Sequence, residues 1–318
     1  MANTRIFFVT DIHGSERCFR KFVNAGPFYK AQILIMGGDI TGKMVLPIVE
    51  QADGTYIAQL VDQDRLVKNK EELDSVEKII RDSGFYPYRT TKEELKELQN
   101  NKVKIDQLFS RLMCKSIERW IDFAEERLKG KDIDMYISPG NDDRFEIDDI
   151  LKQSEFVTYP EGLVIELDRF HEMISTGYTN MTPWKCPRDI EEEELADKIQ
   201  KMVGQVKDMK NCIFNFHCPP YNTPIDAAPQ LDEKLTPMLA PGGDLIMAPA
   251  GSTSVRAAIE TNQPLLGLHG HIHESKGMTR LGKTLCLNPG SEYGEGILRG
   301  VILDLSKKKI EDYLFTSG

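Results

Sequence analysis

The sequence lacks several features that would each assign it to a particular class of protein. No apolar run approaches the roughly 20 residues of a membrane-spanning helix. The apolar stretch from Met1 to Val9 is too short, and too soon followed by Asp11, for a signal peptide. The six cysteines are scattered without a Cys-x-x-Cys pair, which favours reduced thiols over a disulfide framework. We therefore expect a soluble cytoplasmic protein with no membrane partner.

An excess of basic residues is also missing. The 318 residues carry 40 Lys and Arg against 50 Asp and Glu, which gives a formal net charge of −10. Proteins that bind nucleic acid generally carry a basic face, so this charge argues against such a partner. It is compatible with a small anionic substrate, because a bound metal can dominate the local field.

What the sequence does contain is five short apolar runs that each lead to a side chain able to bind metal. Their composition is typical of buried strands. Four of the runs cover residues 6–9, 33–36, 135–138 and 212–216, and the fifth opens the segment 265–273. Behind them come, in chain order, Asp11 with His13, then Asp39, Asn141 and His217, and finally His271 with His273.

Three of the six histidines lie in the segment Leu-His-Gly-His-Ile-His at 268–273. Where a chain stays extended, alternate side chains share a face, so His271 and His273 would point the same way. Two imidazoles on one face at a strand end indicate a shared metal, with surface or capped histidines as the alternative. We interpret His269 as a residue that orients a ligand or packs, and His171 as structural.

These groups could meet at one edge of a sheet, because sites in α/β proteins form at the carboxyl ends of strands. Seven groups are too many for one tetrahedral ion, but they suit two divalent ions that share a carboxylate. Oxygen and imidazole ligands without thiolate indicate Mn, with Fe, Zn, Ni or Co as alternatives. Two such ions lower the pKa of a bridging water and neutralise phosphoryl oxygens. The pattern therefore favours hydrolysis of a phosphate ester by a hydroxide held between metals.

In this order the chain presents motifs that resemble those of the calcineurin-like metallophosphoesterases: Asp11-x-His13, Gly38-Asp39, Gly140-Asn141, His217 and Gly270-His271-x-His273. The resemblance implies one α/β (α+β) domain over 1–318, a four-layer αββα sandwich of two mixed β-sheets flanked by helices. It also implies two ligand sets that share Asp39 as a bridge. One metal would take Asp11, His13, Asp39 and His273, and the other would take Asp39, Asn141, His217 and His271.

The third motif departs from the pattern of the family. The family commonly has Gly-Asn-His there, whereas this chain has Gly140-Asn141-Asp142. Asp142 stands where a histidine usually contacts phosphate and assists the leaving group. A carboxylate there repels phosphate unless it is turned away or protonated, and crowding can raise its pKa so that it acts as an acid. We treat Asn141 and Asp142 as catalytic candidates, together with Arg144, which would contact phosphate or form a surface ion pair.

These features predict a phosphodiesterase for a small substrate, a preference inferred from the missing histidine. A phosphomonoesterase is the near alternative. A phosphoesterase-like scaffold with little activity is the alternative from another class, and a nuclease fits the charge poorly.

Two helical segments remain. Residues 45–130 predict a mostly helical insert in which 91–94 fit a capping box. The insert would cover part of the core, cap the site, or form the contact of a homo-oligomer. Asp189 and Glu192 fit a second capping box at the start of a later helix.

Overall fold

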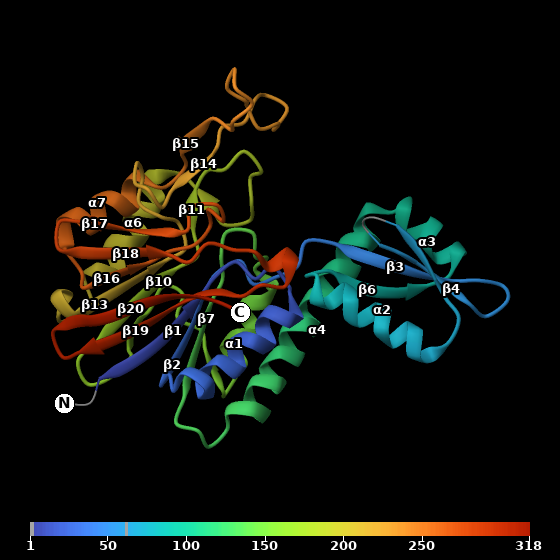
Figure 1. The fold of residues 1–318 in the computed structure, drawn as a ribbon, viewed down its shortest axis with the longest axis horizontal. Coiled ribbons are helices and arrows are strands. Elements are labelled where there is room, and N and C mark those ends of the chain that lie inside the picture. The colour runs from blue at the N-terminus through green and yellow to red at the C-terminus, as the bar shows by residue number, and fades with distance from the viewer. Residues whose placement is uncertain (1–2, 61–62) are drawn as a thin grey trace.

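A computed structural model describes residues 3–60 and 63–318, which form two stacked six-stranded sheets with a smaller lobe beside them (Figure 1). Residues 1–2, at the start of the apolar N-terminal stretch, and 61–62, within the predicted insert, lie outside the described residues. Within the described ranges, no helix is both long enough and apolar enough to span a bilayer.

The first sheet has the strand order β20-β19-β1-β2-β7-β8. Its parallel strands are β1 (Thr4–Val9), β2 (Ile33–Gly37), β7 (Asp134–Ser138) and β8 (Val157–Thr158). β19 (Arg299–Ser306) and β20 (Lys309–Ser317) complete it as antiparallel strands. β1 and β2 are continuous apolar runs because both of their faces are covered.

The second sheet has the order β17-β18-β16-β13-β10-β9. The four central strands run parallel: β18 (Thr284–Asn288), β16 (Leu266–Leu268), β13 (Cys212–Phe216) and β10 (Glu172–Thr176). β17 (Gly277–Leu281) and β9 (Val164–Glu166) lie antiparallel at the edges. Both sheets are therefore mixed, as predicted.

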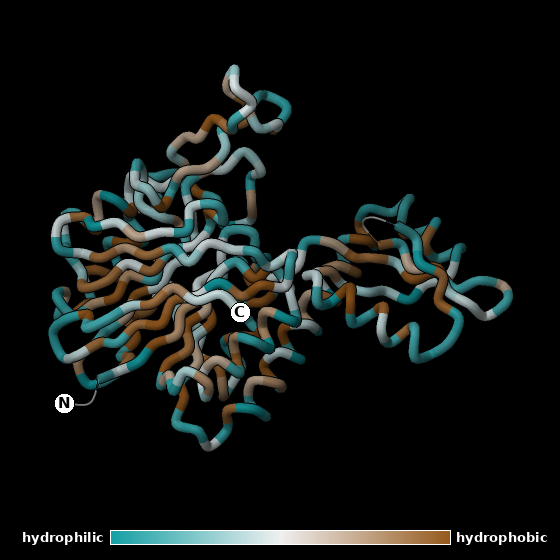
Figure 2. The backbone as a smooth tube through the Cα atoms, viewed as in Figure 1, coloured by the Kyte–Doolittle hydropathy of each residue, from teal (hydrophilic) through white to brown (hydrophobic). Residues whose placement is uncertain are grey.

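Three apolar clusters define the layers. Phe8 and Ile35 of the first sheet pack against Leu268 and Leu285 of the second, and Figure 2 shows these hydrophobic strands stacked in the body of the molecule. α1 (Glu16–Tyr29), α4 (Lys102–Leu128) and α5 (Glu146–Gln153) pack on the outer face of the first sheet. α6 (Glu192–Val203) and α7 (Thr253–Asn262) pack on the outer face of the second. The predicted αββα sandwich is confirmed.

The lobe is built on a separate four-stranded sheet with the order β5-β4-β3-β6. Its strands are β3 (Val45–Glu50), β4 (Tyr56–Gln59), β5 (Asp64–Val67) and β6 (Tyr86–Thr90). α2 (Lys70–Asp82) packs on them through an apolar cluster of the lobe itself, which includes Ile48 and Val76. In its described residues, 45–60 and 63–130, this segment holds three helices, α2, α3 (Lys92–Gln99) and α4, together with a sheet that the prediction of a mostly helical insert did not include. Thr91 caps α3 as predicted, because its Oγ1 accepts from the backbone N of Glu94 at 3.2 Å.

The remaining elements are short. β11 (Thr179–Asn180) pairs with β12 (Asp189–Ile190), and β14 (Ala227–Pro229) pairs with β15 (Met247–Pro249) in an arm that projects from the body (Figure 1). Two single-turn helices, η1 (Met209–Asn211) and η2 (Tyr293–Glu295), complete the chain.

Candidate metal centre

The predicted ligands follow the carboxyl ends of parallel strands in both sheets. The first sheet supplies four of them, behind β1, β2 and β7: Asp11, His13, Asp39 and Asn141. The second sheet supplies three, behind β13 and β16: His217, His271 and His273. Five of the seven residues are buried, and only His271 and His273 are partly exposed.

Six of these side chains form two compact groups. Within each group the ligand-type atoms lie within 4.8 Å of one another, and the groups are Asp11 with His13 and His273, and Asp39 with His217 and His271. The groups adjoin, because His217 Nε2 lies 3.5 Å from Asp39 Oδ2 and 3.7 Å from Asp11 Oδ1. His13 Nε2 in turn lies 3.7 Å from Asp39 Oδ2. Asp39 therefore lies between the groups, where a bridging carboxylate has to be, although the bridge itself stays a prediction.

Buried atoms without partners show that these residues fit metal ions. Among the described residues, His13 Nδ1, Asn141 Oδ1 and His217 Nε2 are buried and have no hydrogen-bond partner. A buried polar atom left unpaired costs about 1–3 kcal/mol, and a bound cation would offset this cost. The ring of His217 is held for this purpose, because its Nδ1 donates to the Gly37 carbonyl at 3.0 Å and Nε2 is left facing the carboxylates.

The backbone at four of the ligands adopts conformations that residues other than glycine usually avoid. Asp11, His13, Asp39 and His271 have φ values of 54°, 39°, 48° and 66°. Non-glycine residues with positive φ are uncommon and cluster at functional sites. Because the chain is not extended at His271, the prediction that His271 and His273 share a face through strand alternation was wrong. The two rings instead enter different groups.

Two glycines allow the ligand loops to approach one another. A Cβ on Gly38 would lie 2.4 Å from His217 Nδ1, and a Cβ on Gly140 would lie 2.2 Å from Asp39 Oδ1. Any side chain at either position would displace a ligand, which gives the Gly38-Asp39 and Gly140-Asn141 motifs a steric reason.

The protonation states of most ligands suit a divalent cation. Burial alone would raise the pKa of Asp11, but His217 and His273 outweigh it and lower that pKa to about 2. Burial lowers the pKa of His13 to about 3 and that of His271 to about 4, so both rings are neutral near pH 7. His217 and His273 differ. Burial would lower both pKa values, but Asp39 and Asp11 raise the pKa of His217 to about 9, and Asp11 raises that of His273. A metal would have to displace the proton of His217, as metals generally do when they bind.

Asp142 lies at the rim of the ligand groups and is paired with Lys43. Its Oδ2 lies 3.3 Å from Lys43 Nζ and 4.0 Å from His13 Nδ1. Burial and the nearby Asp39 raise the pKa of Asp142, whereas Lys43 opposes this shift. Lys43 therefore offsets the negative charge of Asp142, at the position where the expected histidine is missing. No sequence pattern assigned a role to Lys43.

Arg144 is directed away from the ligand groups. Its Nη2 lies 2.8 Å from a carboxylate oxygen of Asp106, and its Nη1 donates to Ser110 Oγ at 2.9 Å. The guanidinium also lies 4.5 Å from the ring centroid of Phe109. All three partners belong to α4, so Arg144 forms the ion pair that was the alternative to a phosphate contact.

Two further carboxylates hold the site, and no local pattern signalled either role. Asp143 is buried and accepts from the backbone N atoms of Ile40, Thr41 and Gly140 at 2.8–3.1 Å, which ties the Asp39 turn to the Asn141 turn. Asp189 Oδ1 accepts from Asn141 Nδ2 at 2.8 Å.

The contact with Asp189 leaves Asn141 Oδ1 as the free ligand atom. The prediction that Asp189 opens a capping box was wrong, because α6 begins at Glu192 with Glu191 as its N-cap and no side-chain cap bond. Glu192 instead accepts from the start of α7, including Ser252 Oγ at 2.7 Å.

The other two histidines have structural contacts. His171 Nδ1 lies 2.8 Å from Asp168 Oδ2, and its Nε2 lies 3.1 Å from the Ser306 carbonyl. His269 Nδ1 lies 2.8 Å from the Phe216 carbonyl, directly before His217, so His269 packs beneath the site as interpreted.

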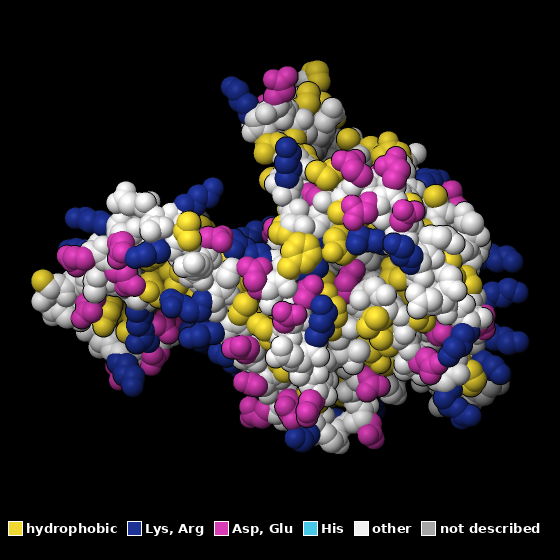
Figure 3. Space-filling model, turned by 180° about the vertical axis from the view of Figure 1, so that it is seen from behind, with side chains coloured by type: hydrophobic (Ala, Val, Ile, Leu, Met, Phe, Trp, Pro, Cys, Tyr) yellow, Lys and Arg dark blue, Asp and Glu magenta, His cyan; other side chains and the backbone are white. Residues whose placement is uncertain are grey.

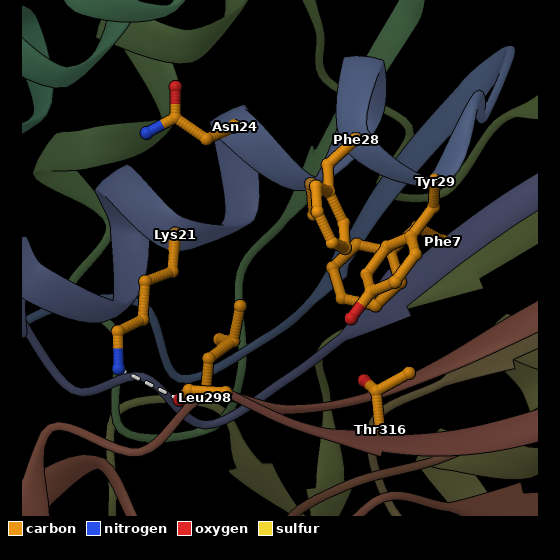
Figure 4. A pocket seen from close by; sticks show the side chains of 9 residues that line it. Phe7, Lys21, Asn24, Phe28, Tyr29, Leu298 and Thr316 are labelled. Atoms are coloured by element: carbon orange, nitrogen blue, oxygen red, sulfur yellow. Dashed lines mark hydrogen bonds between the residues drawn. The ribbon is translucent and has the colours of Figure 1, made fainter.

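One cavity opens on the body, and another opens where the lobe meets the body. The first, of about 300 Å³, lies between α1 and the last strand and has an apolar lining that includes Phe7, Phe28 and Leu298 (Figure 4). Lys21 closes its edge by donating to the Gly318 carbonyl at 2.8 Å, and none of the predicted ligands lines it. The other, of about 570 Å³, is lined by Asp142 and Lys43 and thus opens beside the ligand groups.

Comparisons with known structures agree with this fold. One crystal structure matches with a TM-score of 0.57 at 15% identity and 98% coverage of each chain. The crystal structure of the protein TT1561 of Thermus thermophilus matches with a TM-score of 0.52 at 13% identity, over 100% of this chain and 99% of its own. At these identities the likeness concerns the fold. The chain shares the fold of these structures and presents the ordered ligand motifs at the ends of its strands.

Comparison at the level of sequence is more limited. No protein-family model matches the chain. The uncharacterized protein MJ1162 of Methanocaldococcus jannaschii is 31% identical over 153 residues, which are 48% of this chain and 61% of the relative. The match thus spans less than two thirds of that relative.

Proposed function

We propose that the protein is a dinuclear metal-dependent phosphoesterase that hydrolyses a small phosphodiester. The proposal depends on one observation, the two adjoining ligand groups, whose buried His217 Nε2 has no hydrogen-bond partner. We assign Asp11, His13, Asp39 and His273 to one ion and Asp39, Asn141, His217 and His271 to the other. When bound, two such ions lower the pKa of a water to supply the nucleophile and offset charge on the phosphoryl oxygens.

The side chains around the site have separate roles. Neutral His13 and His271 offer lone pairs, and Asp189 holds the amide of Asn141 so that its oxygen is free. Lys43 supplies a positive charge at the rim beside Asp142. Mn²⁺ is the metal we favour for this set of oxygen and imidazole ligands. All six cysteines are unpaired thiols, which supports a cytoplasmic location.

The charge of Asp142 supports a diester over a monoester. A phosphomonoester carries close to two negative charges at neutral pH, because its second pKa is about 6. A diester carries one and meets less repulsion from a carboxylate. The same residue favours the second candidate, a scaffold with little activity, because Asp142 replaces the usual imidazole beside the leaving group.

The test is hydrolysis of bis(p-nitrophenyl) phosphate against p-nitrophenyl phosphate by protein stripped with a chelator and refilled with Mn²⁺. We expect two bound Mn²⁺ per chain and turnover of the diester that exceeds turnover of the monoester. Asp39→Asn should lower activity by more than about 100-fold and reduce the bound metal, because it removes the shared carboxylate. Asp122→Asn, at an exposed position of α4, is the matched control and should change neither. Two bound metals without turnover of either ester would identify the scaffold.

A further inference from the structure

We propose that the cavity beside Asp142 is a substrate subsite for a planar aromatic group that carries an anion, of which a nucleotide is the biological example. The ring would stack on Trp184, and the anion would lie near Lys102 and Lys185. This inference rests on the proposed function, because the subsite would receive one substituent of the ester.

The position of this cavity, which we call the groove, is the first support. The groove lies where α4 and the start of the lobe meet the loop 184–187, and its lining includes Val45, Phe109 and Trp184. Asp142 lines it as well, and the backbone N of Asp142 donates to Asp39 Oδ1 at 3.0 Å. The groove thus begins one residue away from the ligand groups. If the phosphorus of an ester lies at the ligand groups, one of its substituents would extend into the groove.

An exposed indole provides the surface for stacking. Trp184 is 63% exposed, whereas Trp120, the other tryptophan of the chain, is 3% exposed and stacks on Phe19. Aromatic side chains beside a cationic groove are the usual platform for bases, because every base offers a π-face. The backbone of the next residue, Lys185, has a φ of 53°, a strained conformation of the kind that clusters at binding sites.

The groove is cationic although the chain is acidic. Four cationic and two acidic side chains line it, whereas the formal net charge of the chain is −10. The two acids are already paired, Asp106 with Arg144 and Asp142 with Lys43. The other two cations, Lys102 and Lys185, have no ion-pair partner among residues 3–60 and 63–318. Figure 3 shows dark-blue Lys and Arg side chains gathered on the part of the lobe next to the body.

Hydrogen bonds fix the loop of Trp184 relative to the ligand groups. Asp189 Oδ2 accepts from the backbone N of Thr182 at 3.1 Å and of Cys186 at 2.9 Å. The other oxygen of the same carboxylate accepts from Asn141. A single side chain therefore sets the distance between the loop and a predicted metal ligand. Such preorganisation is what a subsite needs to orient a substrate.

The kinetic test uses two diesters with the same nitrophenolate leaving group. One is methyl p-nitrophenyl phosphate, and the other is thymidine 3′-phosphate 5′-(p-nitrophenyl phosphate), whose 3′-phosphate supplies the anion for the groove. We expect the nucleotide ester to have the higher kcat/KM, and Trp184→Ala to lower the ratio of the two values by about 10-fold or more. Trp184→Phe should restore most of the ratio. Phe28→Ala removes another exposed aromatic ring, which does not line the groove, and should leave the ratio unchanged. A ratio that Trp184→Ala does not change would overturn the proposal.

A binding test separates the subsite from the proposed activity. The full chain carrying Asp39→Asn, stripped of metal, is titrated with adenosine 5′-monophosphate while tryptophan fluorescence is recorded. We expect quenching that is absent in the Trp184→Phe background. It should also be weaker with adenosine, absent with inorganic phosphate, and several-fold weaker with Lys102→Gln or Lys185→Gln. Lys308→Gln, an exposed lysine on the β19–β20 turn, is the control. Absence of quenching contradicts the subsite, whereas quenching by a protein that hydrolyses no ester contradicts the proposed activity alone.

Discussion

Replacing Asp189 tests how strongly metal binding depends on residues next to the ligands. Asp189 holds Asn141 through one oxygen and the loop 182–186 through the other. Asp189→Ala should weaken binding of Mn²⁺ by about 10- to 100-fold, because residues that orient a ligand contribute that much to metal affinity. Competition of Mn²⁺ with a chelating dye measures the change. Asp197→Ala, at an exposed position of α6, should leave the affinity unaltered, and equal affinities for the two variants would contradict this role.

The residue types at the site could be predicted, but their geometry could not. Asp39 and His217 each follow a buried apolar strand, so their place at a sheet edge follows from sequence alone. The positive φ of Asp39 arises from contacts with distant loops and leaves no local pattern. Asp189 lies 48 residues from Asn141, and its spacing to Glu192 imitates a helix cap. The local spacing therefore predicts a helix cap, whereas in the folded chain Asp189 accepts a hydrogen bond from Asn141.

At the scale of elements, α4 joins the lobe to the body. Near its start, Phe109 contacts Tyr86 of the lobe with ring centroids 5.5 Å apart. Further along, Met113 and Trp120 are buried in the cluster that covers the first sheet. The helix could be predicted from its periodic apolar residues, but the lobe sheet could not. β5 has four residues, three of them exposed, so it carries too few apolar positions to show a period of two.

The apolar cluster of the lobe leads to a prediction about local stability. Ile48 is fully buried in the centre of the lobe sheet, and Ile48→Ala should destabilise the lobe by about 2–5 kcal/mol. Amide hydrogen exchange should become faster in β3 to β6 and α2 and stay unchanged in β13 and β16. Leu66→Ala removes a side chain that is 53% exposed in the same sheet and should have little effect. Faster exchange throughout the body would mean that lobe and body unfold as one unit.

At the scale of the whole molecule, the chain crosses from the first sheet to the second between β8 and β9, and Glu161 lies on that crossing. Its carboxylate accepts from the backbone N of Gly177 at 2.6 Å and from Thr176 Oγ1 at 2.9 Å. Burial nevertheless dominates and raises the pKa of Glu161 from 4.5 to about 7. The folded chain therefore keeps this proton at pH values where the unfolded chain has released it.

The sign of this shift sets the dependence of stability on pH. Between pH 4.5 and about 7 the unfolded state binds fewer protons at this group, so the contribution of Glu161 to stability decreases as pH rises. Glu161→Gln removes the titration and should gain on the order of 2 kcal/mol relative to wild type at pH 8, and little at pH 5. Urea unfolding at both pH values measures the difference. A gain that is equal at the two values would show that charge at Glu161 is not the cause.

Each ligand group draws side chains from both sheets, and this has a consequence for synthesis on the ribosome. Asp11 and His13 emerge early, but their group is complete only with His273, and the group of Asp39 waits for His217 and His271. The first sheet alone cannot hold either ion in the arrangement we propose. A nascent chain would therefore acquire its metals late, after most of its length has been translated. Metal uptake would then mark the end of folding.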